Sequence, residues 1–454
     1  MNQSKSSLQS LGVLIVVAIA FAMSGSDARC QQEAPKSTTD VTAPKAAASP
    51  TADDDYWDGE WLTGDWDGER KRLREKGVEL DFRLTQGYQG VANGSVLEHG
   101  AYGGKFDTDF KVNMEKLAGW KGFSWQVRTE TRFGDFAKVV GTKMIPVTYL
   151  ITPKASETVG AISALNFTQL IPLDAKKGNF IMLGAGRYYG FDGADSPFNG
   201  GGGHTTFMHL AFNGTPTNGR LVPSVTNGAN FAWIRKGNPF LTFSVRDATG
   251  HPTTPGISDL FKDGATFITG MNFPTKWLNK TGKQAVTVMV TTKKLTPFDD
   301  RNDGITNPVP PTEPLTPKSG SWIVQYKFFQ YFKEQKEADG YTTGWGIFGT
   351  FARADGKTNK SGLVLAFGAG GTGPFKARKY DRWGAAFLID GVSLFYRRQV
   401  GKEIHLDSEH VLEGFYNFYL TRFISITGDV QVIRPMLTGS GIAVLPAARL
   451  VVNF

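Results

Sequence analysis

Charged side chains of both signs recur at every second position in segments that are otherwise apolar or aromatic. Asp81 and Arg83 are spaced in this way, as are Arg128, Glu130 and Arg132. Arginines that face carboxylates across a water-filled space create a transverse field and offer many hydrogen-bond donors and acceptors, which suits hydroxyl-rich solutes such as sugars. A solvated polar lining without selectivity is the alternative. The candidate contact residues are Asp81, Arg83, Arg128, Glu130, Arg132 and Arg187.

The elements that must position these side chains are β-strands, because successive side chains of a strand point to opposite faces. From Val78 to Gln89, apolar and aromatic residues fall mainly on one face and charged or polar residues on the other. The same alternation runs through 106–114 and 123–133. Each segment has roughly the length of a tilted strand that crosses a membrane. We therefore expect the charged faces to meet inside one lumen.

Later segments continue this alternation, with varying clarity. They are 161–170, 179–188, 206–213, 229–235, 240–247, 264–273, 284–293, 321–331, 343–353, 362–369, 384–398, 409–420, 422–433 and 442–454. Together with the first three they make about seventeen strands, whereas bacterial barrels normally have an even number. The weakest segment, 206–213, is better assigned to a loop. The sequence thus predicts an all-β fold, a transmembrane antiparallel β-barrel of about 16 strands.

Composition agrees with a β-rich chain that has many turns. Glycine occurs 54 times, aromatic residues make up 12%, and the 454 residues contain one cysteine, so a disulfide within the chain is excluded. After the first 25 residues no apolar run reaches the ~18 residues that a membrane helix needs, so a membrane protein of this sequence must be a closed barrel. A soluble β-sandwich or propeller also accommodates the aromatic residues, but it explains the fully charged strand faces less well.

The N-terminal part predicts export and a short helical segment before the barrel. Residues 1–28 have the layout of a secretory signal peptide, with Lys5, an apolar run and small residues near Ala28. We expect 29–56 to be a flexible linker rich in Ala, Pro and Thr. Residues 57–77 predict a periplasmic helix that Asp65 or Asp67 caps and Gly77 ends. The barrel domain then covers 78–454, and its last strand ends on an aromatic residue, as outer-membrane strands do.

Three predicted connections are long: 190–205, 247–263 and 295–320. In outer-membrane barrels the external loops are long and the periplasmic turns are short. The glycine-rich stretch 199–204 has the conformational freedom to fold into a lumen and narrow it.

Motifs that would indicate other chemistry are incomplete. Residues 368–373 satisfy a dinucleotide-binding glycine pattern, but Pro374 and Phe375 follow where a helix should open, so a hairpin loop is the better interpretation. Residues 299–304 resemble a calcium loop without its bidentate glutamate, since Pro310 stands at the twelfth position. We predict no cofactor, no metal and no enzymatic activity. The formal charge of +8 is scattered rather than clustered, which favours a positive lumen or rim over a nucleic-acid partner.

Both ends of the chain resemble a known family, the OprB carbohydrate-selective porins. Residues 61–68 read WLTGDWDG, and Arg70, Leu73 and Gly77 follow, similar to the family run TGDWGG-x-R-x-x-L-x-x-x-G. Residues 409–416, the strand 420–432 and the closing 449–454 resemble the last three strands of the family. Asp67 stands where the family usually has glycine, and the middle loops do not align, so no constriction residue is carried over. The resemblance implies a sixteen-stranded outer-membrane barrel through which glucose and similar sugars diffuse passively.

Two other functions stay open on the sequence. One is a general or anion-preferring diffusion porin, which the net positive charge favours. The other is a non-conducting barrel that serves as a scaffold or adhesin. The expected partners are small carbohydrates and outer-membrane lipid, and the sequence leaves open whether the barrels stand alone or form a homotrimer.

Overall fold

The computed structural model describes residues 54–93, 100–136, 145–151, 160–190, 196–299, 315–400 and 404–454. The predicted signal peptide, the linker up to residue 53 and most of the calcium-like loop, from residue 300 onward, lie outside these ranges.

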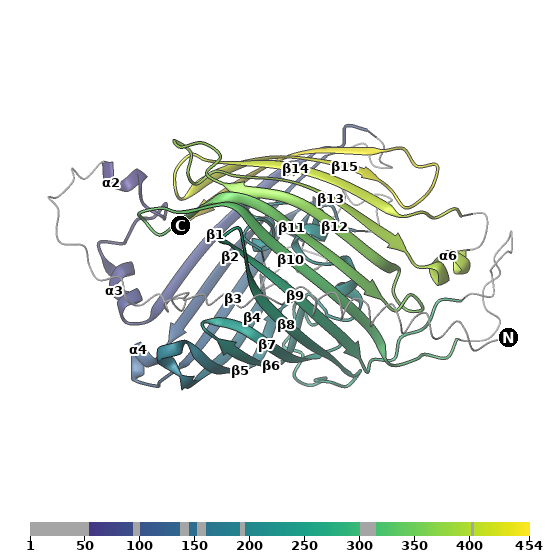
Figure 1. Cartoon of the computed structure of the whole chain (residues 1–454), viewed down its shortest axis with the longest axis horizontal. Coiled ribbons are helices and arrows are strands. Elements are labelled where there is room, and N and C mark those ends of the chain that lie inside the picture. Colours follow the sequence, from purple (N-terminus) through teal and green to yellow (C-terminus); the bar gives the residue numbers. More distant parts are fainter. Residues whose placement is uncertain are drawn as a thin grey trace.

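Sixteen antiparallel strands form one closed barrel in which each strand pairs with its neighbours in sequence and β1 pairs with β16 (Figure 1). The strands are β1 (Val78–Gln89), β2 (Ala101–Asn113), β3 (Phe123–Gly134), β4 (Gly160–Asp174), β5 (Asn179–Tyr189), β6 (Val225–Arg235), β7 (Asn238–Asp247), β8 (Ala265–Trp277), β9 (Lys280–Thr291), β10 (Ser321–Lys336), β11 (Thr342–Ala354), β12 (Ser361–Thr372), β13 (Arg382–Val392), β14 (Glu409–Tyr419), β15 (Ile424–Arg434) and β16 (Ala443–Asn453). The predicted fold class and strand number are confirmed.

Two local predictions about the strands were wrong. The strand predicted at 384–398 ends at Val392, and the helix α6 (Leu394–Val400) follows it after Ser393, whose hydroxyl accepts a hydrogen bond from the Phe395 amide. The glycines at 368–372 belong to β12 rather than to a hairpin loop. The absent side chain of Gly370 leaves room inside the barrel for Phe198, because a Cβ there would lie 3.3 Å from the Phe198 side chain.

The helices are short. They are α2 (Asp54–Trp57), α3 (Glu69–Glu75), α4 (Met114–Ala118), α5 (Leu210–Asn213) and α6. The predicted helix after Trp57 is α3, but Gly68, rather than an aspartate, stands at its N-cap. Asp65 still contributes, since its carboxylate accepts a hydrogen bond from the Lys71 amide at 3.1 Å. In the described part of the chain, no helix is both long enough and apolar enough to cross a membrane.

The barrel has a short-turn end and a long-loop end. At the short-turn end, β6 and β7 are joined by Lys236 and Gly237, and β8 and β9 by Leu278 and Asn279, all with positive φ as tight hairpins require. The three long connections predicted from the sequence all lie at the opposite end, because they follow the odd-numbered strands β5, β7 and β9. Figure 1 shows α2, α3 and α4 at the short-turn end and α6 at the long-loop end.

Both ends of the described chain meet at the short-turn end. The Phe454 amide donates to the Phe82 carbonyl at 2.9 Å, and the Leu62 amide donates to the Asn453 carbonyl at 2.8 Å. Arg70, only 3% exposed, donates to the Phe454 carbonyl at 2.9 Å and lies over the ring of Trp66. Residues 56–77, called the N-terminal segment below, are therefore fixed to the rim of the barrel.

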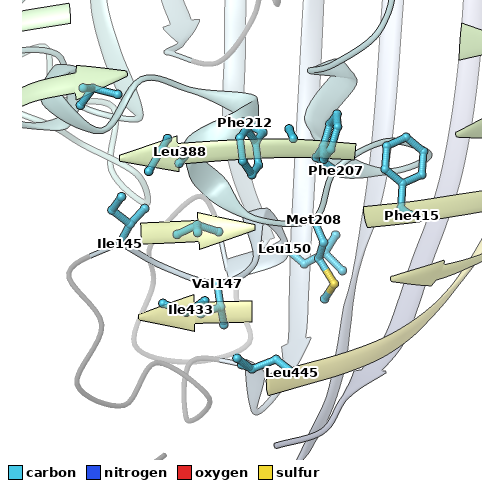
Figure 2. Close-up of a cluster of buried hydrophobic side chains, with 14 of the residues drawn as sticks. Ile145, Val147, Leu150, Phe207, Met208, Phe212, Leu388, Phe415, Ile433 and Leu445 are labelled. Carbon is cyan, nitrogen blue, oxygen red and sulfur yellow. The ribbon is translucent and has the colours of Figure 1, made fainter. Parts of the chain in front are cut away.

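The main apolar core lies inside the barrel, where two long-loop connections fold back against β11–β16. Figure 2 shows Ile145, Val147 and Leu150 of one connection and Phe207, Met208 and Phe212 of the other beside strand residues. The two connections also bond to each other, since the Tyr149 amide donates to the Met208 carbonyl at 2.8 Å. We call residues 196–224 the inner loop.

A charged pathway beside the inner loop

A cavity of about 800 Å³ lies inside the barrel, between β1–β3 and the inner loop. Charged residues dominate its lining near the strands. The side chains of Tyr149, Tyr189 and His204 face it from the connections and strand ends, and aromatic and charged residues surround it near the short-turn end. The alternation of β1–β3 thus places its polar faces toward one water-accessible space, as the sequence predicted.

Cross-strand pairing sets opposite charges side by side on this wall. Antiparallel partners share a face, and the register places Arg83 opposite Asp107 and Arg128 opposite Asp109. Arg128 donates to the Asp109 carboxylate at 3.1 Å, and Lys111 contacts the same carboxylate at 3.3 Å. The wall is therefore a ladder of paired charges rather than a stripe of one sign.

Lys105 is the most enclosed member of this ladder. It is 1% exposed, and its ammonium lies 3.1 Å from Glu130 and 3.4 Å from Asp107. The rings of Tyr149 and Tyr189 lie 5.1 Å and 5.8 Å from the same nitrogen, within cation–π range. Two carboxylates and two aromatic rings fix this charge in one position, so its field on the cavity is preorganised.

The inner loop supplies the facing wall through a run of four glycines. Gly200 to Gly203 all have φ between 63° and 90°, a conformation that side chains disfavour. The turn brings His204 to the barrel wall, where its Nδ1 lies 2.7 Å from the Thr85 hydroxyl and its Nε2 lies 3.4 Å from Asp107. The glycine-rich stretch predicted to fold into the lumen does so.

Buried charges hold the inner loop to β14–β16. Glu413 accepts hydrogen bonds from the amides of Met208 and His209, the latter at 3.1 Å. Arg449, 1% exposed, donates to the carbonyls of Gly203 and Thr206. These bonds attach the backbone of the inner loop to the inner face of β14 and β16, at residues 203, 206, 208 and 209.

Aromatic packing completes this attachment. The Phe207 ring lies 4.8 Å from Phe415 and 5.6 Å from Phe348, measured between centroids. A Cβ at Gly384 would lie 2.8 Å from the Phe207 ring, so a side chain on β13 at that position would force the ring to shift. The inner loop thus packs against the β11–β16 side, and the charged part of the cavity lies beside β1–β3.

Of the six residues predicted as solute contacts, four line the cavity in the structure and two do not. Asp81, Arg83, Arg128 and Glu130 line the cavity together. Arg132 faces Lys105 in the register of β2 and β3 but is not among the lining residues. Arg187 lies apart from the cavity lining: it donates to the carbonyls of Thr254 at 2.8 Å and Pro255 at 3.2 Å, and so anchors a long-loop connection.

Four residues of β2 belong to the site although none was among the predicted contacts. Lys105, Asp107, Asp109 and Lys111 all line the cavity. Their alternation is visible in the sequence, but the predicted strand began at 106 and so excluded Lys105. His204 was not predicted as a lining residue, because its position depends on a turn that folds it back onto β1 and β2.

Comparison with known families decides the identity of this barrel. The OprB family of carbohydrate-selective porins matches residues 98–436. The chain belongs to the OprB family. The N-terminal motif at 61–77, which resembles this family, lies before the matched range. Among curated proteins, none matches the chain.

Solved structures of an OprB porin share the fold. The high-pH structure of Pseudomonas putida OprB has 16% sequence identity and a TM-score of 0.71, over 87% of this chain and 99% of that one. The low-pH structure of the same porin has 14% identity and a TM-score of 0.52, with the same coverage. As a member of the OprB family, the protein is a porin of the bacterial outer membrane. In outer-membrane barrels the short turns face the periplasm, so we expect the short-turn end of this barrel on that side. Within the described residues, no group of three histidine, cysteine or acidic side chains can hold a metal ion.

Proposed function

We propose that this porin lets small neutral sugars such as glucose diffuse passively into the periplasm. The observation that carries the proposal is the near balance of charge around the cavity. The cationic side chains of the lining are Arg74, Arg83, Lys105, Lys111, Arg128 and Arg422, and the carboxylates are Glu60, Asp81, Asp107, Asp109 and Glu130. Six cations against five carboxylates give many donors and acceptors with little net charge, which suits a polar, uncharged solute.

Pairing within the lining supports the same conclusion. Asp109 is engaged by Arg128, Lys111 and Gln126, and Lys105 by two carboxylates. Paired charges repel small ions less than a ring of unpaired charges of one sign would, so the pore selects only weakly by charge. They favour solutes whose groups both accept and donate hydrogen bonds. A cavity of about 800 Å³ lies within the range that encloses small organic ligands.

The alternative of an anion-preferring porin rests on the net charge of +8. That charge belongs to the whole chain, whereas the field acting on a solute comes mainly from the lining, which is close to neutral. No step in this proposal requires a cofactor, an energy source or a catalytic residue.

The test is conductance of the refolded, full-length protein in planar bilayers, with glucose, maltose and sucrose titrated in turn. We expect open channels whose current falls saturably with at least one sugar, and a reversal potential near zero in a KCl gradient. Channels indifferent to every sugar, with a reversal potential set by chloride, would establish the anion-preferring porin instead. Folded protein that forms no channels would overturn the transport proposal.

A further inference from the structure

Three tyrosine rings form a row at the periplasmic end of the cavity. Tyr341 and Tyr380 come from the β10–β11 and β12–β13 turns, and Tyr419 is the last residue of β14. Ring centroids lie 5.3 Å apart for Tyr341 and Tyr380 and 6.3 Å apart for Tyr380 and Tyr419. All three line the same cavity as the charged wall of β1–β3. The tyrosine row therefore lies on the path that a solute takes after passing that wall.

Hydrogen bonds to Asp339, within its own turn and from the neighbouring turn, hold the Tyr380 ring and the backbone of Tyr341 in place. The Tyr380 hydroxyl donates to Asp339 at 2.9 Å, Lys379 donates to the same carboxylate at 2.8 Å, and the Tyr341 amide donates to it at 3.1 Å. These bonds, that from Lys379 foremost, hold the pKa of Asp339 well below its usual range. The carboxylate stays ionised at neutral pH, so it keeps both tyrosines anchored.

A second set of bonds fixes Tyr419. Its amide donates to Asp381 at 3.0 Å, and its carbonyl accepts from Arg378 at 2.7 Å. Asp381 is 1% exposed and pairs with Arg378 at 2.8 Å. Because these contacts involve the backbone of Tyr419, its ring is left to line the cavity, and replacing the ring leaves the turn bonds in place.

Charged groups face the tyrosine row from the N-terminal segment. Glu60, Trp61 and Arg74 line this part of the cavity, and Glu60 forms an ion pair with Arg422, three residues beyond Tyr419. Arg422 also lies 5.3 Å from the centroid of the Tyr380 ring. Preorganised aromatic surface next to paired charges is the combination that recognises a solute with an apolar face and polar edges.

We propose that the tyrosine row is a sugar-binding site at the periplasmic exit, separate from the charged wall. A pyranose ring would stack its C–H face on Tyr341 or Tyr419, while its hydroxyls bond to the charged groups of the N-terminal segment. This site rests on the proposed sugar permeation. It deepens that proposal, because it gives an inward-moving sugar a second binding position before release.

The experiment compares the full-length protein with the double variant Tyr341→Ala/Tyr419→Ala and the double variant Tyr341→Phe/Tyr419→Phe. The binding constant of maltose is measured from the sugar-dependent block of single-channel current. We expect about three- to tenfold weaker binding in the alanine variant, because each lost ring removes a stacking surface, and binding within about twofold of the parent in the phenylalanine variant. Tyr88→Ala serves as the matched control, since Tyr88 is 53% exposed and does not line the cavity.

The outcomes separate this site from the proposed function. If the parent and the alanine variant bind maltose equally well, the tyrosine site is overturned and sugar permeation still stands. Parent channels that no sugar affects would overturn both. Salt conductance of the alanine variant, measured without sugar, verifies that it folds. If that variant forms no channels, the single variant Tyr419→Ala takes its place, with the same expected direction and the same outcome against the proposal.

Discussion

At the scale of single residues, the charged wall depends on how completely each charge is paired. Lys105 is enclosed by two carboxylates and two aromatic rings, whereas Lys111 is 45% exposed and contacts one carboxylate. A buried pair loses much more than an exposed one when a partner is removed, because the remaining charge stays desolvated. The two lysines of β2 therefore carry the same charge but contribute differently to the stability of the barrel.

This difference predicts that Lys105→Met destabilises the barrel by about 3 kcal/mol, because Glu130 and Asp107 are left without their cation. The matched variant Lys111→Met should cost less than about 1 kcal/mol. Urea unfolding of the two variants in lipid bilayers, followed by tryptophan fluorescence, measures both. The Lys105 variant should also shift the reversal potential in a KCl gradient toward cation selectivity. Equal stability of the two variants would show that Lys105 is hydrated in the lumen.

At the scale of elements, the width of the pathway depends on the fit between the inner loop and the wall of β11–β13. Phe198 and Phe207 occupy positions that glycines leave open, and β14–β16 add the carboxylate and guanidinium that bond to the loop backbone. The glycines of β11–β13 were visible in the sequence, but their purpose was not, because it requires knowing which loop folds inward and which strands it meets.

Gly384→Ala should displace the inner loop. The added methyl group would lie 2.6 Å from the Phe415 ring and 2.8 Å from the Phe207 ring, so both rings must shift, at a cost of about 1 to 3 kcal/mol. We expect higher and noisier single-channel conductance, since the loop forms one wall of the pathway. Gly428→Ala is the control, because a Cβ there meets no atom within 4 Å. Identical conductance in the two variants would mean that the rings adjust without moving the loop.

At the scale of the whole molecule, alternation in sequence was enough to predict the barrel. It was not enough to predict which part of the interior the inner loop occupies and which part stays open as a cavity. Period-two patterns located all sixteen strands, since lipid on one side and water on the other impose the same alternation on each. They failed where a feature depends on distant contacts. Arg187 has the charge of a lumen residue but bonds to loop carbonyls, and Lys105 stood one residue before a predicted strand. Tyr341, Tyr380 and Tyr419 are 39 residues apart in each step and meet only because alternate turns adjoin at one end of the barrel.

The N-terminal segment is attached to the end of the last strand, at the periplasmic mouth of the barrel. Arg70 lies 4.5 Å and 4.2 Å from the ring centroids of Trp61 and Trp66 and donates to the Phe454 carbonyl. Arg70→Met removes both cation–π contacts, each worth about 0.5 to 2 kcal/mol, so we expect trypsin to cleave α3 about tenfold faster. Arg72→Met removes the same number of cleavage sites, but its side chain is 56% exposed and pairs only with Glu69 in the salt bridges of the described residues. Because Glu60, Trp61 and Arg74 line the mouth, the Arg70 variant should also show larger fluctuations of the open current than the Arg72 variant. Equal cleavage and equal current noise in the two variants would mean that the segment is held by its backbone bonds to β16 and not by Arg70.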